Sequence, residues 1–145
     1  MIKKSVGYVT GHKFGGWKIP QKIQTTIMHS NAKNYNISLS YMITEYMDSK
    51  KNNILIKSLQ KDKDIKNIFF TSALQINSTD KKNFNILKNY NLYFFLENIV
   101  IKSKSDFPNV NKFLVLLSDR KQKNFFRKNY LHIYSDYKKA FKDYS

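Results

Sequence analysis

The stretch GYVTGHKFGGWKIP, residues 7–20, sets how the fold begins. Its apolar and aromatic start continues a run without a breaker, which predicts a β-strand over residues 5–10. The connection that follows holds Gly15 and Gly16, and Pro20 then suits the first turn of a helix. Three of the chain's four glycines and one of its two prolines lie in this connection and its closing residue. We therefore expect the most specialised turn of the chain to lie here.

Three further apolar runs, at residues 38–44, 65–72 and 92–101, also predict strands. The last two are apolar on both faces at their centres, which is typical of buried parallel strands. Segments with apolar residues at helical spacing lie between the strands. Strand starts recur roughly every 28 residues, the length of a βα unit, and right-handed crossovers would place helices on both sides of a mainly parallel sheet.

The pattern changes after residue 105. Residues 106–145 predict one or two helices that are rich in aromatic rings and lysines. The sequence thus predicts one three-layer α/β domain over residues 1–145, with a four-stranded, mainly parallel sheet in residues 1–105, flanking helices and a C-terminal helical extension. Such a small sheet has exposed edges and the aromatic tail offers apolar surface, so we expect a homo-oligomer.

The formal net charge is +16 at pH 7. Such a field attracts polyanions such as nucleic acid, and it would also help to hold a phosphorylated small molecule. Arginine, which nucleic-acid readers favour, occurs at only two positions, and the lysines are spread along the whole chain. Abundant Lys, Asn, Ile, Tyr and Phe also fit an AT-rich genome. Nucleic acid stays open as the less favoured partner.

The chain contains no cysteine, which excludes disulfides and thiolate chemistry. Its N-terminus lacks the apolar run of a secretory signal, and no stretch approaches the roughly 20 apolar residues that span a bilayer. We therefore expect a cytoplasmic protein without a membrane span. No histidine and carboxylate have the spacing of a metal site, and the first loop is neither a Walker A motif nor G-x-G-x-x-G, so we expect no metal and no cofactor.

Ligands of an open parallel sheet bind beyond the carboxyl ends of its strands. That rule gathers the loops after the four predicted strands onto one edge, where they offer acid–base groups, hydroxyls, amides and lysines. The candidate site residues are Thr10, His12, Lys13, Gly15, Gly16, Trp17, Lys18, Gln24, Glu45, Ser72 and Glu97.

The first of these loops is the longest. It takes about nine residues where such a connection usually takes a few, and Gly15-Gly16 lets backbone approach a ligand closely. Lys13 and Lys18 would hold an anion, and Trp17 would stack on a flat or sugar-like face. The alternative is a structural loop whose glycines only turn the chain and whose tryptophan belongs to the core.

His12 and Glu97 are the candidate acid–base groups. Histidine exchanges a proton near neutral pH. Glu97 ends a very apolar run, where a carboxylate is either solvated or poised for proton transfer. Thr10, Ser72 and Gln24 would orient the hydroxyl groups of a ligand.

The order of elements at the N-terminus resembles the catalytic domain of serine recombinases. Those domains open with a strand like Y-x-R-V-S-T followed by a glutamine. Here a strand reading G-Y-V leads through a polar loop to a helix with Gln21 and Gln24. Thr10 stands at the arginine position, no serine follows it in the loop, and the catalytic arginines are unmatched. The resemblance implies the fold and argues against strand cleavage.

A closer resemblance covers roughly residues 6 to 105. The run quoted above with Gln24, then F-F-T-S-A-L at residues 69–74 and F-F-L-E-N-I-V at residues 94–100, is similar to the sporadic carbohydrate cluster family. These are small bacterial proteins encoded among genes for surface-polysaccharide and unusual-sugar biosynthesis. The resemblance implies a place in carbohydrate assembly and singles out Thr10, His12, Phe14, Gly15, Gly16, Lys18, Pro20, Gln24, Ser72 and Glu97.

We therefore expect a carbohydrate-biosynthesis protein that binds or acts on a sugar, nucleotide-sugar or sugar phosphate in surface-polysaccharide assembly. As an enzyme it would perform acid–base chemistry on a sugar derivative and would not be a recombinase. Two alternatives stay open. One is a nucleic-acid-binding protein with a resolvase-like fold, and the other is a non-catalytic partner of a glycosyltransferase that docks through the aromatic tail.

Overall fold

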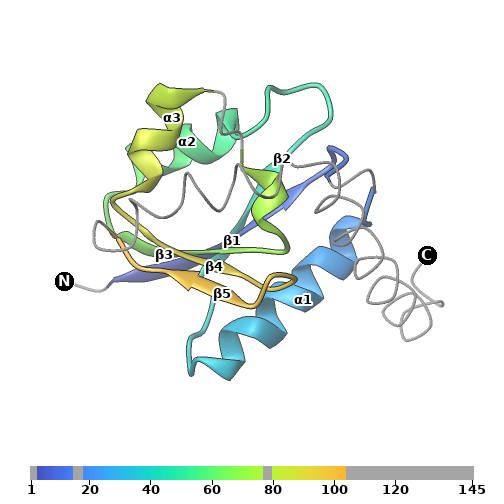
Figure 1. Ribbon diagram of the computed structural model, residues 1–145, viewed down its shortest axis with the longest axis vertical. Helices are drawn as coiled ribbons and strands as arrows, with labels where there is room; N and C mark the ends of the chain where they lie inside the picture. The colour runs from blue at the N-terminus through green and yellow to red at the C-terminus, as the bar shows by residue number, and fades with distance from the viewer. Residues whose placement is uncertain (1–2, 15–17, 77–79, 104–145) are drawn as a thin grey trace.

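A five-stranded sheet in the order β2-β1-β3-β4-β5 forms the centre of the computed structural model, which describes residues 3–14, 18–76 and 80–103 (Figure 1). Strands β1 to β4 run parallel, and β5 runs antiparallel to β4. In chain order the elements are β1 (Lys4–Thr10), α1 (Gln21–Asn34), β2 (Tyr41–Glu45), α2 (Asn53–Lys61), β3 (Ile65–Phe70), the 3₁₀ turn η1 (Ala73–Gln75), α3 (Lys81–Leu87), β4 (Asn91–Phe94) and β5 (Ile99–Ile101).

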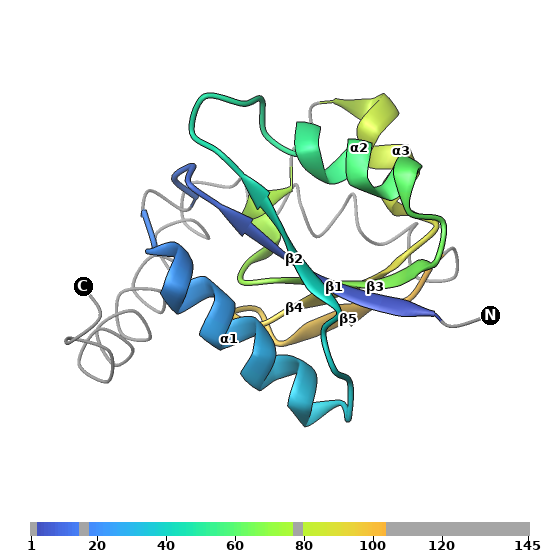
Figure 2. The same cartoon turned by 180° about the vertical axis from the view of Figure 1, so that it is seen from behind.

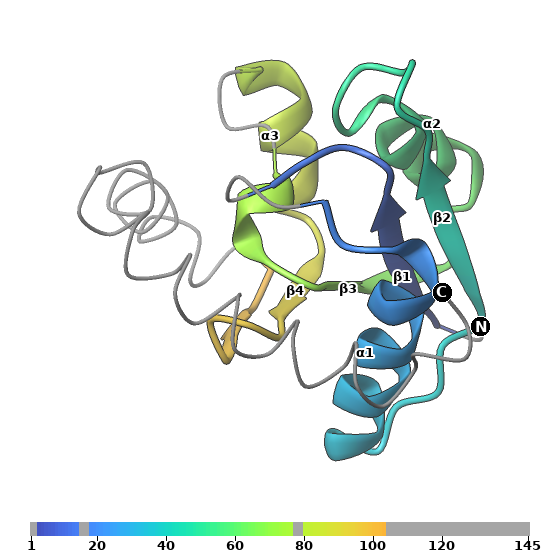
Figure 3. The same ribbon diagram turned by 90° about the vertical axis from the view of Figure 1, so that its right-hand side faces the viewer.

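The helices cover both faces of the sheet, as the sequence predicts. Helix α1 lies on one face, and α2 and α3 lie on the other (Figure 3). The apolar side of α1 is buried as expected at Ile23, Ile27, Met28 and Ala32. The same helical spacing also predicts Tyr35 on that side, but Tyr35 caps the helix and stays 39% exposed. The three-layer α/β arrangement is therefore confirmed.

Strand β1 supplies both halves of the core. Val6 and Tyr8 are fully buried in the larger apolar cluster with α2, α3 and β3. Val9 faces the other way and packs with Met28 of α1 and Phe69 of β3. Because successive side chains of a strand point to opposite faces, one short strand can anchor both layers. Burial on both faces matches the near-continuous apolar run in its sequence.

The predicted fourth strand, residues 92–101, is a hairpin of two strands. A turn reverses the chain after β4, where the Asn98 N–H donates to the Phe95 carbonyl at 3.0 Å. Asn98 adopts a left-handed conformation with φ 54°, which asparagine tolerates better than most residues. The prediction of four strands was wrong because an apolar run does not reveal a reversal. Glu97 consequently lies in the turn and not at the end of a strand.

The other strand ends shift by a few residues from their predicted bounds. The sequence predicts a strand to residue 72, but β3 ends at Phe70. Ser72 has left the sheet because its hydroxyl oxygen accepts the Leu74 N–H and so caps η1. The second strand was expected over residues 38–44 and instead runs from Tyr41 to Glu45.

Several predictions lie outside the described residues. They are Gly15, Gly16 and Trp17 of the first loop and the C-terminal helices with their aromatic tail in residues 106–145. In the part of the chain that is described, no helix is both long enough and apolar enough to cross a membrane.

Candidate functional site at the carboxyl edge of the sheet

The parallel strands end at one edge, where the loops after β1 and β2 lie side by side (Figures 1 and 2). Thr10 pairs with Glu45 in the register of β1 and β2, so the two strands finish together. The strand order reverses between β1 and β3, because the chain leaves β1 toward β2 and later returns across it. In sheets of this order the crevice at the reversal is where ligands bind.

A buried pair of glutamine amides bridges that reversal. The Thr10 N–H donates to Gln24 Oε1 at 3.0 Å, and Gln24 Nε2 donates to the carbonyls of Thr10 at 2.8 Å and Ile19 at 2.7 Å. Gln75 Nε2 donates to the same Gln24 oxygen at 3.1 Å. Gln24 is 0% exposed and uses its full hydrogen-bonding capacity. The amide therefore joins the end of β1, the entry to α1 and the loop after β3.

A second buried cluster lies at the end of β2. Glu45 is 0% exposed, and its carboxylate accepts from Tyr8 Oη at 3.3 Å, from the Ile54 N–H at 2.9 Å and from Ser49 Oγ. Burial, followed by the neighbouring Glu45 charge, raises the pKa of Tyr8 well above its usual value. The phenol therefore stays protonated and donates to Glu45. The Ile54 N–H belongs to the first turn of α2, where a negative charge is favourable.

Asn52 connects the two clusters. It precedes α2 with φ 67°, and its Nδ2 donates to Tyr8 Oη at 3.2 Å and to the Gln75 carbonyl at 2.9 Å. Hydrogen bonds thus run without interruption from Glu45 through Tyr8, Asn52 and Gln75 to Gln24. Buried polar groups are costly when unpaired, so this network fixes the relative positions of three strand ends.

Ser72 and Glu97 meet at the ends of β3 and β4. Ser72 Oγ donates to Glu97 Oε2 at 2.8 Å, and the Ala73 N–H donates to Glu97 Oε1 at 2.7 Å. Ser72 is 0% exposed, whereas Glu97 is half-buried. The Ser72 N–H also donates to Gln75 Oε1 at 3.1 Å, which ties this pair to the rest of the network.

His12 lies above the network on the loop after β1. The backbone N–H of His12 donates to Thr10 Oγ1 at 3.0 Å, and the ring atom Nε2 lies 2.8 Å from the Tyr46 carbonyl oxygen. A carbonyl oxygen only accepts, so Nε2 carries the hydrogen in this contact and Nδ1 is left as the acceptor of the neutral ring. The half-buried ring is thus held between the loops after β1 and β2 in one tautomer.

The two loops that hold His12 also carry lysines and large exposed side chains. Lys13 and Lys18 are exposed on the same loop, and Lys18 Nζ lies 3.1 Å from Met47 Sδ. Tyr46 is 60% exposed and Met47 is 67% exposed, which is unusual for side chains of this size. We call these side chains, His12, Lys13, Lys18, Tyr46 and Met47, the rim of the edge. The rim combines positive charge with a surface on which a ring can stack.

The predicted site residues divide into two groups. Lys13 and Lys18 are exposed, and His12 and Glu97 are half-buried. Hydrogen bonds connect His12 to Glu97 through Thr10, Gln24, Gln75 and Ser72. Four others are at most 3% exposed and hold the edge together from beneath: Thr10, Gln24, Glu45 and Ser72.

Three members of the network, Gln75, Asn52 and Tyr8, are not among the candidate site residues predicted from the sequence. Gln75 had a readable signal, since Ser72 and Gln75 form the S-x-x-Q pattern of a capping box. Asn52 and Tyr8 had none, because their partners are distant in the sequence. Among the described residues, no group of three His, Cys, Asp or Glu side chains is placed to hold a metal ion.

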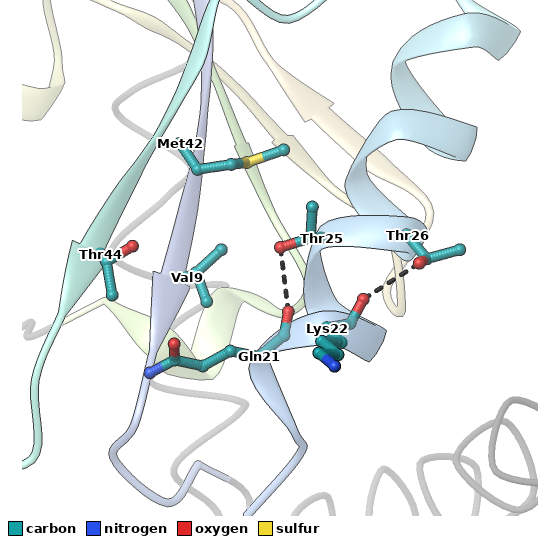
Figure 4. A pocket seen from close by; sticks show the side chains of 7 residues that line it. All are labelled: Val9, Gln21, Lys22, Thr25, Thr26, Met42 and Thr44. Atoms are coloured by element: carbon teal, nitrogen blue, oxygen red, sulfur yellow. Dashed lines mark hydrogen bonds between the residues drawn. The ribbon is translucent and has the colours of Figure 1, made fainter. Parts of the chain in front are cut away.

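A cavity of about 600 Å³ lies on the α1 side of the sheet (Figure 4). It is lined by Val9, Gln21, Lys22, Thr25, Thr26, Met42 and Thr44. None of the predicted site residues that the structure describes is among them.

No protein-family model and no curated protein matches the chain. Among solved structures, the N-terminal catalytic domain of TP901-1 integrase, a serine-recombinase domain, is similar with a TM-score of 0.54 and 16% identity. The match covers 81% of this chain and 100% of that domain. This likeness shows the fold and supports the resemblance to serine recombinases at that level. The resemblance to the sporadic carbohydrate cluster family gains no support from the comparisons.

Proposed function

We propose that the rim around His12 binds a sugar derivative that carries phosphate, as part of carbohydrate biosynthesis. The observation that carries the proposal is the 2.8 Å contact between His12 Nε2 and the Tyr46 carbonyl oxygen, on a loop that also carries the exposed Lys13 and Lys18. Lysine ammonium groups attract a phosphate, and an exposed tyrosine ring offers a face for a sugar ring. The sequence resemblance supports the carbohydrate class, and the exposed lysines and His12 on this loop support an anion site with an acid–base group.

As an enzyme, the protein would use His12 Nδ1 to accept or donate the proton of a sugar hydroxyl. Positioned acid–base groups contribute about 10²- to 10⁴-fold to rate. Glu97 is fixed by Ser72 and the Ala73 N–H, so it serves as an acceptor for a ligand hydroxyl at the far side of the edge. Gln24 and Gln75 act through position alone, because they lie beneath the rim.

A thermal-shift panel of sugar phosphates, nucleotide sugars and unphosphorylated sugars tests the proposal. A ligand at 100 times its Kd stabilises the folded protein by about 2.7 kcal/mol, or roughly 8 °C for a chain of this size. We expect the shift only with phosphorylated ligands.

Two variants probe the residues assigned to the rim. His12→Gln keeps a donor for the Tyr46 carbonyl but has no titrating atom, and Lys18→Gln removes one positive charge. We expect both to reduce the shift. His29→Gln and Lys33→Gln are matched controls, since both side chains are exposed on α1 away from the edge. If no phosphorylated sugar shifts the wild type, or if all four variants respond equally, the proposal fails.

Nucleic-acid binding is the second candidate. It is favoured by the net charge of +16 and by the fold shared with a recombinase catalytic domain. Cleavage is not part of this candidate, since residues 11–20 contain no serine. It predicts duplex binding whose affinity falls steeply with salt. Mobility shifts that are absent even at low salt would remove it.

The expected homo-oligomer and the docking to a glycosyltransferase stay predictions. Light scattering on the purified chain checks the first of these directly.

A further inference from the structure

The cavity on the α1 side of the sheet exists because α1 does not cover the edge strand β2. Helix α1 packs against β1 and β3, and β2 packs against α2 on the opposite face. The side chains of β2 that point toward α1, Met42 and Thr44, are therefore only half-buried. With Val9 they form the floor beneath the first two turns of α1 (Figure 4).

The walls of the cavity carry several hydrogen-bonding groups. Thr25 Oγ1 donates to the Gln21 carbonyl at 2.9 Å, and Thr26 Oγ1 donates to the Lys22 carbonyl at 3.0 Å. Both hydroxyl protons are committed, so these oxygens can only accept from a ligand. Within the described residues, the Gln21 amide and the Thr44 hydroxyl have no side-chain hydrogen bond, so they remain able to donate and to accept.

The charge of the lining is one-sided. Among the described residues that line the cavity, Lys22 is the only ionisable one, and none is a carboxylate. The floor of Val9 and Met42 is apolar and suits the face of a flat ring. A ligand for this lining presents a flat ring, a donor–acceptor edge, further donor groups and a negative charge. A nucleotide has all four, and a primary amide is the side chain that pairs bidentately with a base edge.

The cavity also adjoins the rim that holds His12. A Cβ placed on Gly11 would lie 3.6 Å from Gln21 Nε2 and 3.2 Å from Met47 Cγ. The Gln21 amide therefore lies against the residue that precedes His12. A ligand with its base in the cavity would extend its phosphates past Gly11 toward Lys18.

We propose that the cavity between α1 and β2 binds the nucleoside end of a nucleoside-diphosphate-linked sugar, with the base edge on the Gln21 amide and the ring face on Met42. The inference rests on the proposed function, because it assigns the sugar end of the same ligand to the rim. The volume of the cavity, about 600 Å³, falls within the range of small-ligand sites, roughly 300–1,000 Å³.

Calorimetric titration with ADP, GDP, CDP, UDP and inorganic phosphate tests the inference. We expect at least one diphosphate to bind more tightly than phosphate alone. Thr44→Val and Gln21→Met preserve size and remove the polar group, and each should weaken that binding about 3- to 10-fold, the value of one hydrogen bond. Thr71→Val is the matched control, since it makes the same change at a buried threonine outside the lining, and it should bind like the wild type.

The inference is overturned if no nucleoside diphosphate binds more tightly than phosphate, or if Thr44→Val and Gln21→Met both bind with wild-type affinity. The same measurements distinguish an error in the cavity assignment from an error in the assignment of the rim. Sugar phosphates that bind in a His12-dependent way without any nucleotide binding would overturn the cavity assignment alone. Diphosphate binding that depends on Thr44, with no response to the attached sugar, would support the cavity and contradict the rim.

Discussion

Replacing Gln24 with leucine should remove much of the stability of this fold. The substitution is close in volume, but it takes away both the acceptor and the two donors of the amide. Four buried partners lose a hydrogen bond: the N–H and carbonyl of Thr10, the carbonyl of Ile19 and Nε2 of Gln75. Each buried polar group left without a partner costs about 1–3 kcal/mol.

The four losses will not add fully, because the Gln75 side chain can turn and the loop at Ile19 can relax. We expect the free energy of unfolding to fall by about 3–5 kcal/mol, against a total of about 5–15 kcal/mol for a typical domain. In urea, where the slope is about 1–3 kcal/mol per molar, this moves the midpoint by roughly 2 M.

Equilibrium urea unfolding followed by far-UV circular dichroism measures the effect. Gln21→Leu is the control, since it makes the same change one turn earlier on α1 at an exposed side chain and should stay within about 0.5 kcal/mol of the wild type. Gln24→Glu adds a second probe. The glutamate places an oxygen against the carbonyls of Thr10 and Ile19, and protonation of the carboxyl restores one donor. The loss of unfolding free energy in this variant should therefore shrink as the pH falls.

The reasoning is refuted if Gln24→Leu unfolds within about 1 kcal/mol of the wild type with an unchanged slope. That result would mean that the amide network stabilises the edge no better than apolar packing does.

Three further predictions concern single side chains. Thr71 is fully buried and its Oγ1 has no partner among the described residues, so Thr71→Val should raise the free energy of unfolding by about 1 kcal/mol; a loss of that size would contradict it. Hydrogen bonds from Tyr41 and then Lys4 lower the pKa of Asp62. A carboxyl with a lowered pKa stabilises the fold at pH values above its unfolded-state pKa, and this stabilisation is lost as the pH falls. Asp62→Asn should therefore flatten the acid side of the curve of unfolding free energy against pH, measured between pH 7 and about pH 2.5. Parallel curves for the variant and the wild type would count against the hydrogen bonds from Tyr41 and Lys4. Asn98 has φ 54°, so Asn98→Gly should be neutral while Asn98→Val should cost about 1–2 kcal/mol in urea unfolding, and equal stability of the two would show that the turn is not strained.

The layers of the fold could be predicted because apolar periodicity is a local property. Burial can be predicted without knowing which segment packs against which. Examples are the apolar runs around Val6 and Phe69 and the helical spacing of Ile23 and Ile27. The same pattern predicts which loops lie at the carboxyl edge of the sheet, because parallel strands end at the same edge. The hairpin at Asn98 was missed because its reversal depends on one residue in a left-handed conformation inside an apolar run.

The site could be predicted only in part, because hydrogen-bond partners are not local. Gln24 and Gln75 are 51 residues apart in sequence, and Tyr8 and Asn52 are 44 residues apart. No pattern in one sequence reports that such side chains meet. Glu45 illustrates the difficulty: a glutamate after a strand predicts a ligand contact, and only the structure shows that the N-terminus of α2 encloses it.

The Gln24–Gln75 bridge also decides where a ligand can sit. It occupies the reversal between β1 and β3, the position where sheets of this order usually receive a ligand. A ligand that entered there would have to break hydrogen bonds at both amides and leave their partners unpaired. In the proposed function, the sugar end of the ligand therefore binds at the loops above the bridge, which carry His12, Lys18 and Tyr46. The likeness to a recombinase domain is one of fold, and a shared fold does not determine the side chains on which recognition at this edge would depend.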